Sequence, residues 1–143
     1  DNVTEKEAEC LFIAPEAHIL LVDDNELNLV VAKELLKPLR MQIDTAENGL
    51  QAVKMVRGSQ YDLVLMDVQM PVMNGYEATQ KIRASAKTDA RTVPIVAMTA
   101  DAFAEDIIEA KKAGMNSHLA KPLNLATLVR EINKQLQKHW KRE

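Results

Sequence analysis

Short apolar runs alternate along the chain with longer segments in which apolar residues recur at helical spacing. Runs of four to six residues rich in leucine, isoleucine and valine are typical of strands that are buried on both faces of a parallel sheet. We expect such strands at 19–22, 41–46, 63–66, 93–98 and 117–120. Strands that alternate with helices predict an α/β fold, in which right-handed crossovers leave a parallel sheet covered by helices on both faces.

Five helices are expected to follow these strands. In the first, Leu27, Val31 and Leu35 recur at every fourth position with Ala32 and Leu36 beside them, and Pro38 ends the helix. A second helix is expected between the possible cap Asn48 and Gly58, a third at 75–84, a fourth at 103–113 that Gly114 closes, and a fifth after the possible cap Asn124.

Composition and charge narrow the class of protein. The chain has 143 residues, of which 47% are apolar and 27% are charged, so one packed domain is expected. The formal net charge of −3 gives no bulk basic footprint, and we expect no direct nucleic-acid binding. No apolar run approaches the ~20 residues of a membrane helix, so we expect no membrane contact by this chain. The single Cys10 excludes an intramolecular disulfide and favours the cytoplasm.

The polar, acidic start of the chain differs from the rest. Residues 1–17 are expected to be a linker or leader, and a short strand or helix packed on the domain is the alternative. The folded domain is expected at 18–138, followed by a tail at 139–143. Because the chain lacks a starting methionine, we expect a piece of a longer protein, whose parent could be anchored in a membrane.

Polar side chains follow four of the five predicted strands. Asp23 and Asp24 follow the first strand, Asp67 the third, Thr99 the fourth and Lys121 the fifth. Each alone is ordinary, since an aspartate after a strand is more often a helix cap than a reactive group. The carboxyl ends of parallel strands, however, share one edge of the sheet, and ligands bind there. We therefore expect three carboxylates, a hydroxyl and an ammonium to gather at that edge.

Three clustered carboxylates repel one another, by roughly 4 kcal/mol for a pair about 4 Å apart at an effective dielectric constant of about 20. Either one carboxyl is protonated or a cation is bound, and an all-oxygen site suits Mg²⁺. A metal-free network of helix caps and ion pairs is the alternative. A carboxylate can also attack phosphorus and form an aspartyl-phosphate. Asp67 is the candidate nucleophile because it follows the most apolar strand, and Thr99 and Lys121 could neutralise the phosphoryl oxygens.

Four separate motifs carry these residues: Val-Asp-Asp-Asn at 22–25, Met-Asp-Val-Gln-Met-Pro-Val-Met-Asn-Gly at 66–75, Met-Thr-Ala at 98–100 and Lys-Pro at 121–122. Over about residues 17–138 the chain resembles the response-regulator receiver domain of two-component systems, and most of all the receivers of hybrid sensor histidine kinases. The resemblance implies a flavodoxin-like (βα)5 three-layer sandwich, with a five-stranded parallel sheet of order 2-1-3-4-5.

The same resemblance implies a role for each acidic residue. Asp67 would take a phosphoryl group from a phosphohistidine and would also ligate Mg²⁺. Asp24 would ligate Mg²⁺ directly, the backbone carbonyl of Gln69 would be a further ligand, and Asp23 would act mainly through water. The domain itself would catalyse only its own phosphorylation and dephosphorylation.

The resemblance also implies how the phosphoryl group is sensed. Thr99 would bond one phosphoryl oxygen after activation, and Lys121 would pair with another. The Lys121–Pro122 peptide bond is expected to be cis. Many receivers carry an aromatic residue three positions before the lysine as a switch coupled to the threonine, and here His118 stands there. A histidine can swing between exposed and buried positions, but it is smaller and can titrate, and a structural role is the alternative.

The function implied is phosphorelay signal transduction, in which phosphorylation of Asp67 switches the conformation of the domain. A place in a hybrid sensor histidine kinase is expected, and a stand-alone response regulator or a pseudo-receiver that only binds protein are the alternatives. The expected partner is a histidine kinase or a histidine phosphotransfer domain. A homodimer could form through the fourth helix, fifth strand and fifth helix. A magnesium-dependent phosphatase is disfavoured because Gln69 replaces the second aspartate of such enzymes.

Overall fold

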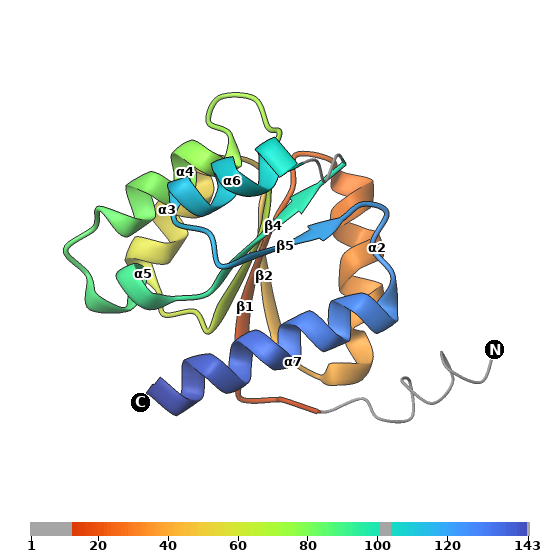
Figure 1. Cartoon of the computed structure of the whole chain (residues 1–143). Helices are drawn as coiled ribbons and strands as arrows, with labels where there is room; N and C mark the ends of the chain where they lie inside the picture. The colour runs from red at the N-terminus through yellow and green to blue at the C-terminus, as the bar shows by residue number, and fades with distance from the viewer. Residues whose placement is uncertain (1–12, 101–103, 143) are drawn as a thin grey trace.

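The computed structural model describes residues 13–100 and 104–142, and a single parallel sheet forms its centre (Figure 1). The strand order is β2-β1-β3-β4-β5, and every neighbouring pair is parallel. The strands are β1 His18–Val22, β2 Gln42–Ala46, β3 Leu63–Asp67, β4 Ile95–Thr99 and β5 Ser117–Ala120. The predicted α/β fold and the sheet order 2-1-3-4-5 are confirmed.

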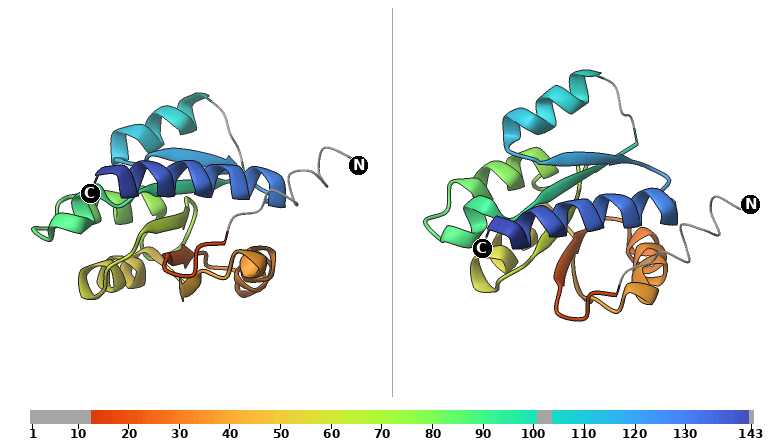
Figure 2. Two further views of the ribbon diagram at one scale, coloured as in Figure 1. Left: turned by 90° about the horizontal axis from the view of Figure 1, so that it is seen from below. Right: turned by 60° about the horizontal axis from the view of Figure 1, so that its bottom comes forward.

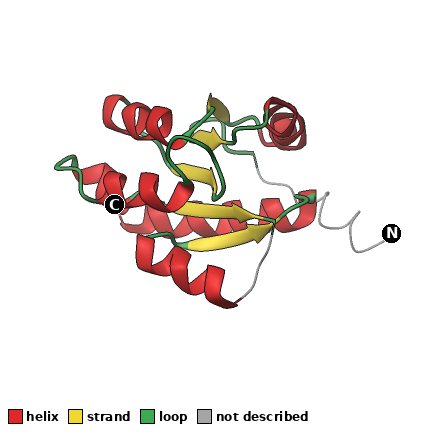
Figure 3. Cartoon of the chain, turned by 90° about the horizontal axis from the view of Figure 1, so that it is seen from above, coloured by secondary structure: helices red, strands yellow, loops and turns green. Residues whose placement is uncertain are grey.

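Helices cover both faces of the sheet, which lies in the middle of the molecule (Figure 3). α2 and α7 pack on one face, and α3, α4, α5 and α6 lie on the other. Figure 2 shows β5 between α6 and α7. The helices in the described part of the chain are α2 Glu26–Leu36, α3 Gly49–Gly58, α4 Gly75–Arg83, α5 Thr88–Thr92, α6 Ala104–Ala113 and α7 Leu125–Arg142, with the 3-10 helix η1 at Lys37–Leu39.

The central strand β3 shows why its sequence is apolar throughout. All of its residues are buried, and its side chains alternate between two cores. Leu63 and Leu65 pack with α2 and α7, whereas Val64 and Met66 pack with the helices on the opposite face. Asp67 is the last residue of this strand, so the buried sheet fixes its backbone at the carboxyl edge.

The buried face of α2 differs from the one that the sequence pattern predicts. Leu27 and Val31 are 68% and 49% exposed, whereas Ala32 and Leu36, which lie beside them in the pattern, are buried together with Leu29. α2 is apolar on more than one side, so residue spacing alone permits more than one stripe. Packing against the sheet settles the choice, since Leu29, Ala32 and Leu36 belong to the core on that face. The side chain of Asn25 accepts the first free backbone N–H groups and starts the helix shortly after β1.

The short helix α5 lies where the sequence pattern predicts no element, because Thr88–Thr92 has no apolar periodicity. Its one buried residue is Ala90, and Arg83 Nη1 of α4 donates a hydrogen bond of 3.1 Å to the carbonyl oxygen of Ala90. Tertiary contacts therefore hold this helix rather than its own propensity. Position 103, where the fourth predicted helix begins, lies outside the described residues.

The domain includes part of the segment expected as a leader at 1–17. Ala14 and Ala17 are buried, and the backbone N–H of Ala14 donates a hydrogen bond of 2.9 Å to the carbonyl oxygen of Leu39. The last residues of that segment therefore pack on the domain. Residues 1–12 lie outside the described part of the chain.

The last helix, α7, continues into the segment expected as a tail at 139–143 and ends at Arg142. His139 is 7% exposed, and its Nε2 lies 3.4 Å from Oδ1 of Asp62. Trp140 Nε1 donates a hydrogen bond of 3.4 Å to the same oxygen atom, so Asp62 holds the end of the helix against the sheet. In the described part of the chain, no helix is both long enough and apolar enough to span a membrane.

Candidate functional site

Three carboxylates meet at the carboxyl edge of the sheet, as the strand-end residues predict. Asp23 and Asp24 follow β1, and Asp67 ends β3. One carboxylate oxygen of each lies within 4.8 Å of those of the other two. Asp23 and Asp67 are buried, whereas Asp24 is exposed and faces solvent. The edge therefore holds two fixed carboxylates and one that a solvated ion can reach.

Lys121 joins two of these carboxylates. Its Nζ lies 3.0 Å from Oδ2 of Asp23 and 3.2 Å from Oδ1 of Asp67. The backbone N–H of Lys121 donates a hydrogen bond of 2.8 Å to the carbonyl oxygen of Thr99, which brings the ends of β4 and β5 together. The Lys121–Pro122 peptide bond is cis, as the resemblance implies.

The first turn of α2 fixes the orientation of Asp23. Its Oδ1 accepts a hydrogen bond of 2.9 Å from the backbone N–H of Asn25. Asn28 Nδ2 lies 3.4 Å from both carboxylate oxygens of Asp23. No motif of the sequence singles out Asn28. The signal for it is an amide side chain in the first turn of the helix that follows the acidic pair.

The buried carboxyl of Asp67 is electrostatically strained. Burial, and then the charge of Asp23, raise the pKa of Asp67 to about 6, and Lys121 offsets part of this effect. Burial acts to lower the pKa of Lys121, but its hydrogen bond to Asp23 and the charges of Asp67 and Asp23 outweigh burial and raise it. Three carboxylates with one ammonium leave an excess of negative charge that a divalent cation would relieve.

The donor set fits a hard cation. The cluster offers only carboxylate oxygens, with neither a thiolate nor an imidazole, and Mg²⁺ prefers such oxygen ligands. Gln69, whose carbonyl is the expected further ligand, follows Asp67 by two positions. Asp24, Asp67 and Gln69 are therefore the residues that could hold Mg²⁺, and Asp23 is engaged by Lys121.

The loop between β3 and α4 folds back closely over Asp67. The backbone N–H of Gly75 donates a hydrogen bond of 2.9 Å to the carbonyl oxygen of Val68. A Cβ atom at position 75 would collide with the backbone carbonyl oxygen of Asp67. Glycine is needed here for close approach. Asn74 then caps α4 in a capping box with Glu77.

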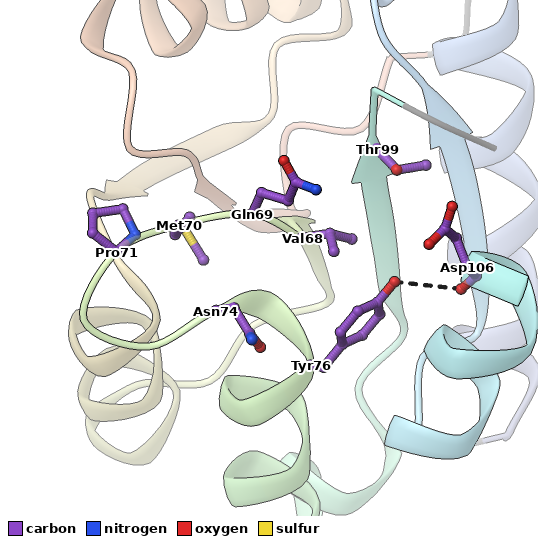
Figure 4. A pocket seen from close by; sticks show the side chains of 8 residues that line it. All are labelled: Val68, Gln69, Met70, Pro71, Asn74, Tyr76, Thr99 and Asp106. Carbon is purple, nitrogen blue, oxygen red and sulfur yellow. Dashed lines mark hydrogen bonds between the residues drawn. The ribbon is translucent and has the colours of Figure 1, made fainter. Parts of the chain in front are cut away.

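A cavity of about 520 Å³ opens beside this loop. Gln69, Asn74, Tyr76, Thr99 and Asp106 line it together with the apolar residues of the loop (Figure 4). The half-buried side chain of Thr99 therefore lies at the cavity next to the acidic cluster. The structure brings Gln69 and Thr99 to the same opening, as their positions in the motifs predict.

His118 lies away from that opening. It is half-buried on β5 and lines a different cavity of about 260 Å³, together with Ile107 of α6 and Met115. Two residues along the strand, Ala120 pairs with Thr99 in the sheet register. His118 and Thr99 are thus connected through adjacent strands, and the switch role of His118 stays a prediction.

Known proteins are similar in sequence to this chain. A family model described as the response regulator receiver domain matches residues 19–133. Hybrid signal transduction histidine kinase G of Dictyostelium discoideum is 44% identical over 121 residues, which cover 83% of this chain and 4% of that protein. Sensor protein GacS of Pseudomonas syringae pv. syringae is 40% identical over 117 residues, which cover 81% of this chain and 13% of that protein. The chain thus spans a small part of the curated relatives that it matches.

Solved structures agree with this comparison. The receiver domain of sensor histidine kinase PA1611 from Pseudomonas aeruginosa PAO1, which has a magnesium ion in its active-site cleft, is 40% identical with a TM-score of 0.78, covering 85% of this chain and 98% of that one. A co-crystal structure joins the Saccharomyces cerevisiae histidine phosphotransfer protein Ypd1 to the receiver domain of Ssk1. It matches at 31% identity and a TM-score of 0.76, covering 83% of this chain and 88% of that one.

Proposed function

The chain belongs to the response regulator receiver domain family, and we propose that it accepts a phosphoryl group from a phosphohistidine onto Asp67 in a step that needs Mg²⁺. The observation that carries this proposal is the geometry of the carboxyl edge. Asp67 lies within 4.8 Å of two further carboxylates and 3.2 Å from the ammonium of Lys121. A buried acceptor, a hard-cation site and a fixed positive charge are the parts that phosphoryl transfer needs.

Asp67 supplies the nucleophile. Its carboxylate oxygen forms a bond to phosphorus while the bond between phosphorus and the imidazole nitrogen of the donor breaks. The leaving imidazole keeps the electron pair of that bond and takes a proton from solvent. With a pKa of about 6, the Asp67 carboxyl is mostly ionised at neutral pH and can attack without a separate general base.

Lys121 and the other edge residues stabilise the product. The Lys121 ammonium, already 3.2 Å from Oδ1 of Asp67, would pair with a phosphoryl oxygen. Asp24, Asp67 and the carbonyl of Gln69 would hold Mg²⁺, with Asp23 acting through water. When bound, the ion supplies positive charge beside the phosphoryl oxygens. Thr99 would donate a hydrogen bond to a phosphoryl oxygen, and His118 would respond as its partner in the switch.

The setting of the domain is part of the proposal. The matched relatives include a hybrid signal transduction histidine kinase and a sensor protein, of which this chain spans only a small share. We place the chain in a hybrid sensor histidine kinase in the cytoplasm, with a kinase or a histidine phosphotransfer domain as the donor. That donor class is supported by the receiver of Ssk1, which was solved with such a protein. Self-association through α6, β5 and α7 is a further expectation.

Acetyl phosphate labelling tests the acceptor directly. The purified chain is incubated with acetyl phosphate and Mg²⁺, and intact-protein mass spectrometry follows the addition of one phosphoryl group. We expect labelling that requires Mg²⁺, is lost on chelation, and is absent from Asp67→Asn. Asp62→Asn is the matched control, because Asp62 lies at the opposite edge of the sheet, where His18 donates its backbone N–H to it.

Two outcomes would overturn the proposal. One is equal labelling of the wild type and Asp67→Asn, which would move the acceptor elsewhere. The other is no labelling of the wild type under conditions in which a titration shows Mg²⁺ to be bound, which would indicate a receiver used only for protein binding.

A further inference from the structure

Helix α6 is attached to α4 at its two ends by two side chains of the same helix. Tyr76 and Arg83 are seven residues apart on α4, so they project from the same face, two turns apart. Tyr76 contacts the start of α6 at Asp106, and Arg83 contacts Gly114, the residue directly after α6. The strengths of these two attachments differ.

The C-terminal end of α6 is firmly held. Arg83 Nε donates a hydrogen bond of 3.0 Å to the carbonyl oxygen of Gly114, and Nη2 donates one of 2.9 Å to Oδ1 of Asn116. The same Asn116 oxygen accepts the backbone N–H of Ile95 at 2.8 Å, which ties this corner to β4. A guanidinium shared among several fixed acceptors is a rigid anchor.

Of the two attachments that α4 makes to α6, the one nearer the N-terminal end of α6 is the weaker. The hydroxyl of Tyr76 donates a hydrogen bond to the backbone carbonyl oxygen of Asp106 (Figure 4). At 3.4 Å it is long for a hydroxyl donor, for which about 2.8 Å is typical. Burial, with the charges of Asp106 and Glu109, raises the pKa of Tyr76, so the hydroxyl stays protonated and able to donate.

The Tyr76 contact lies beside the candidate phosphoryl site. Tyr76, Asp106 and Thr99 line the same cavity of about 520 Å³, which leaves open space around the hydroxyl. Thr99 ends β4, and α6 is the next helix along the chain. A displacement of Thr99 toward a phosphoryl group would change the cavity that Tyr76 and Asp106 also line, while Arg83 holds the other end of α6 in place.

We propose that the Tyr76 hydroxyl is a positioning group that holds the first turns of α6 in the unmodified arrangement and so opposes phosphorylation of Asp67. This regulatory role rests on the proposed function. A contact made only in the unmodified arrangement lowers the affinity of the site for a phosphoryl group by the free energy of that contact. Tyr76 does not touch the reacting atoms, and it acts through α6 and Thr99.

Beryllofluoride, a mimic of the phosphoryl group, tests this role in the presence of saturating Mg²⁺. Tyr76→Phe removes the hydroxyl and keeps the ring, so the packing between α4 and α6 is preserved. We expect its beryllofluoride affinity, measured by calorimetry, to rise about two- to fivefold, which is the range for one modest hydrogen bond. Its Mg²⁺ affinity should match the wild type, because the acidic cluster is untouched.

Tyr61→Phe is the matched control. It also removes one hydroxyl, but Tyr61 donates to Oδ2 of Asp44 on β2 and does not line this cavity. We expect no change in its beryllofluoride affinity. An unchanged or weaker beryllofluoride affinity in Tyr76→Phe, with normal Mg²⁺ affinity, would overturn the proposal, as would an equal gain in Tyr61→Phe.

Amide hydrogen exchange separates this proposal from the proposed function, because it needs no phosphoryl mimic. In Tyr76→Phe we expect faster exchange at the amides of Ile108 and Glu109, near the start of α6. The amides of Lys112 and Ala113, near the Arg83 anchor, should exchange as in the wild type. Uniform acceleration along α6 would contradict the weak attachment at one end. If the wild type binds neither Mg²⁺ nor beryllofluoride while Tyr76→Phe still shows the end-specific exchange, the proposed function and the regulatory role both fail, and only the attachment of α6 by Tyr76 stands.

Discussion

The ammonium of Lys121 lies 3.2 Å from Oδ1 of Asp67, so the acceptor already has a positive neighbour before any metal binds. Lys121→Met should raise the pKa of Asp67 above about 6, because the lysine acts to lower it. It should also slow labelling by acetyl phosphate roughly a hundredfold, through loss of a charge beside the phosphoryl oxygens. Lys121→Arg keeps the charge and should leave the pKa near that of the wild type. Carboxyl carbon NMR titration measures the pKa, and an unchanged value in Lys121→Met would show that the pair does not interact.

The raised pKa of Asp67 also predicts a pH dependence of stability in the absence of metal. The folded state holds the Asp67 proton up to about pH 6, whereas the ordinary value is 3.8, so the folded state binds more protons between these two values. This carboxyl therefore makes the protein less stable as pH rises from about 4 to about 6, by on the order of 2–3 kcal/mol.

Asp67→Asn removes that penalty. Urea unfolding with a chelator present should show this variant to be more stable than the wild type at pH 7, and the difference should shrink as pH falls toward 4. Mg²⁺ should also reduce the difference, because the ion binds the wild-type cluster and stabilises its charged form. A wild type that is more stable than Asp67→Asn at pH 7 without metal would contradict the assignment of strain to this carboxyl.

Asp24 is the exposed member of the acidic cluster, so its loss should weaken metal binding with little effect on folding. In Asp24→Asn the affinity for Mg²⁺, measured by NMR shifts of the β1 and β3 amides, should fall at least about tenfold. The free energy of unfolding should change by less than about 0.5 kcal/mol. Glu26→Gln, which removes an exposed charge from the first turn of α2, is the control and should keep most of the Mg²⁺ affinity.

Two glycine substitutions should have opposite effects on stability. In Gly75→Ala the new Cβ meets the backbone of Asp67, and neither backbone can give way without moving the acceptor. We expect a loss of about 1–3 kcal/mol together with weaker Mg²⁺ binding. In Gly58→Ala the Cβ meets nothing within 4 Å, and helix propensity should stabilise α3 by up to about 1 kcal/mol. Equal effects in the two variants, measured by urea unfolding, would show that the β3–α4 loop does not fold back closely on Asp67.

Most of the fold could be predicted from the sequence because its elements carry local signals. β3 is apolar throughout since its side chains alternate between two cores, and Asp67 marks where that burial ends. The acidic cluster was predictable for the same reason: parallel strands end at one edge, so Asp23 and Asp67 must be neighbours. The residues at the strand ends therefore predicted both where the strands end and which side chains form the acidic cluster.

Other features depend on contacts that no local pattern encodes. Leu27 and Val31 share a helical stripe, yet the packing of α2 buries Leu29 instead. Thr88–Thr92 is helical because of its neighbours in space, among them Arg83. The orientation of Asp23 likewise depends on the Asn28 amide of the following helix in addition to Asn25 of its own motif.

The burial of β3 has a consequence for the rate of the reaction at its end. A nucleophile carried by a buried strand has little freedom to move before the donor arrives, because that strand is hydrogen-bonded to a neighbouring strand on each side. Most of the reorganisation that a reacting carboxylate would otherwise undergo is thus completed when the protein folds. The rate of the conformational change then depends on the elements around the site, such as the β3–α4 loop and α6, and not on β3.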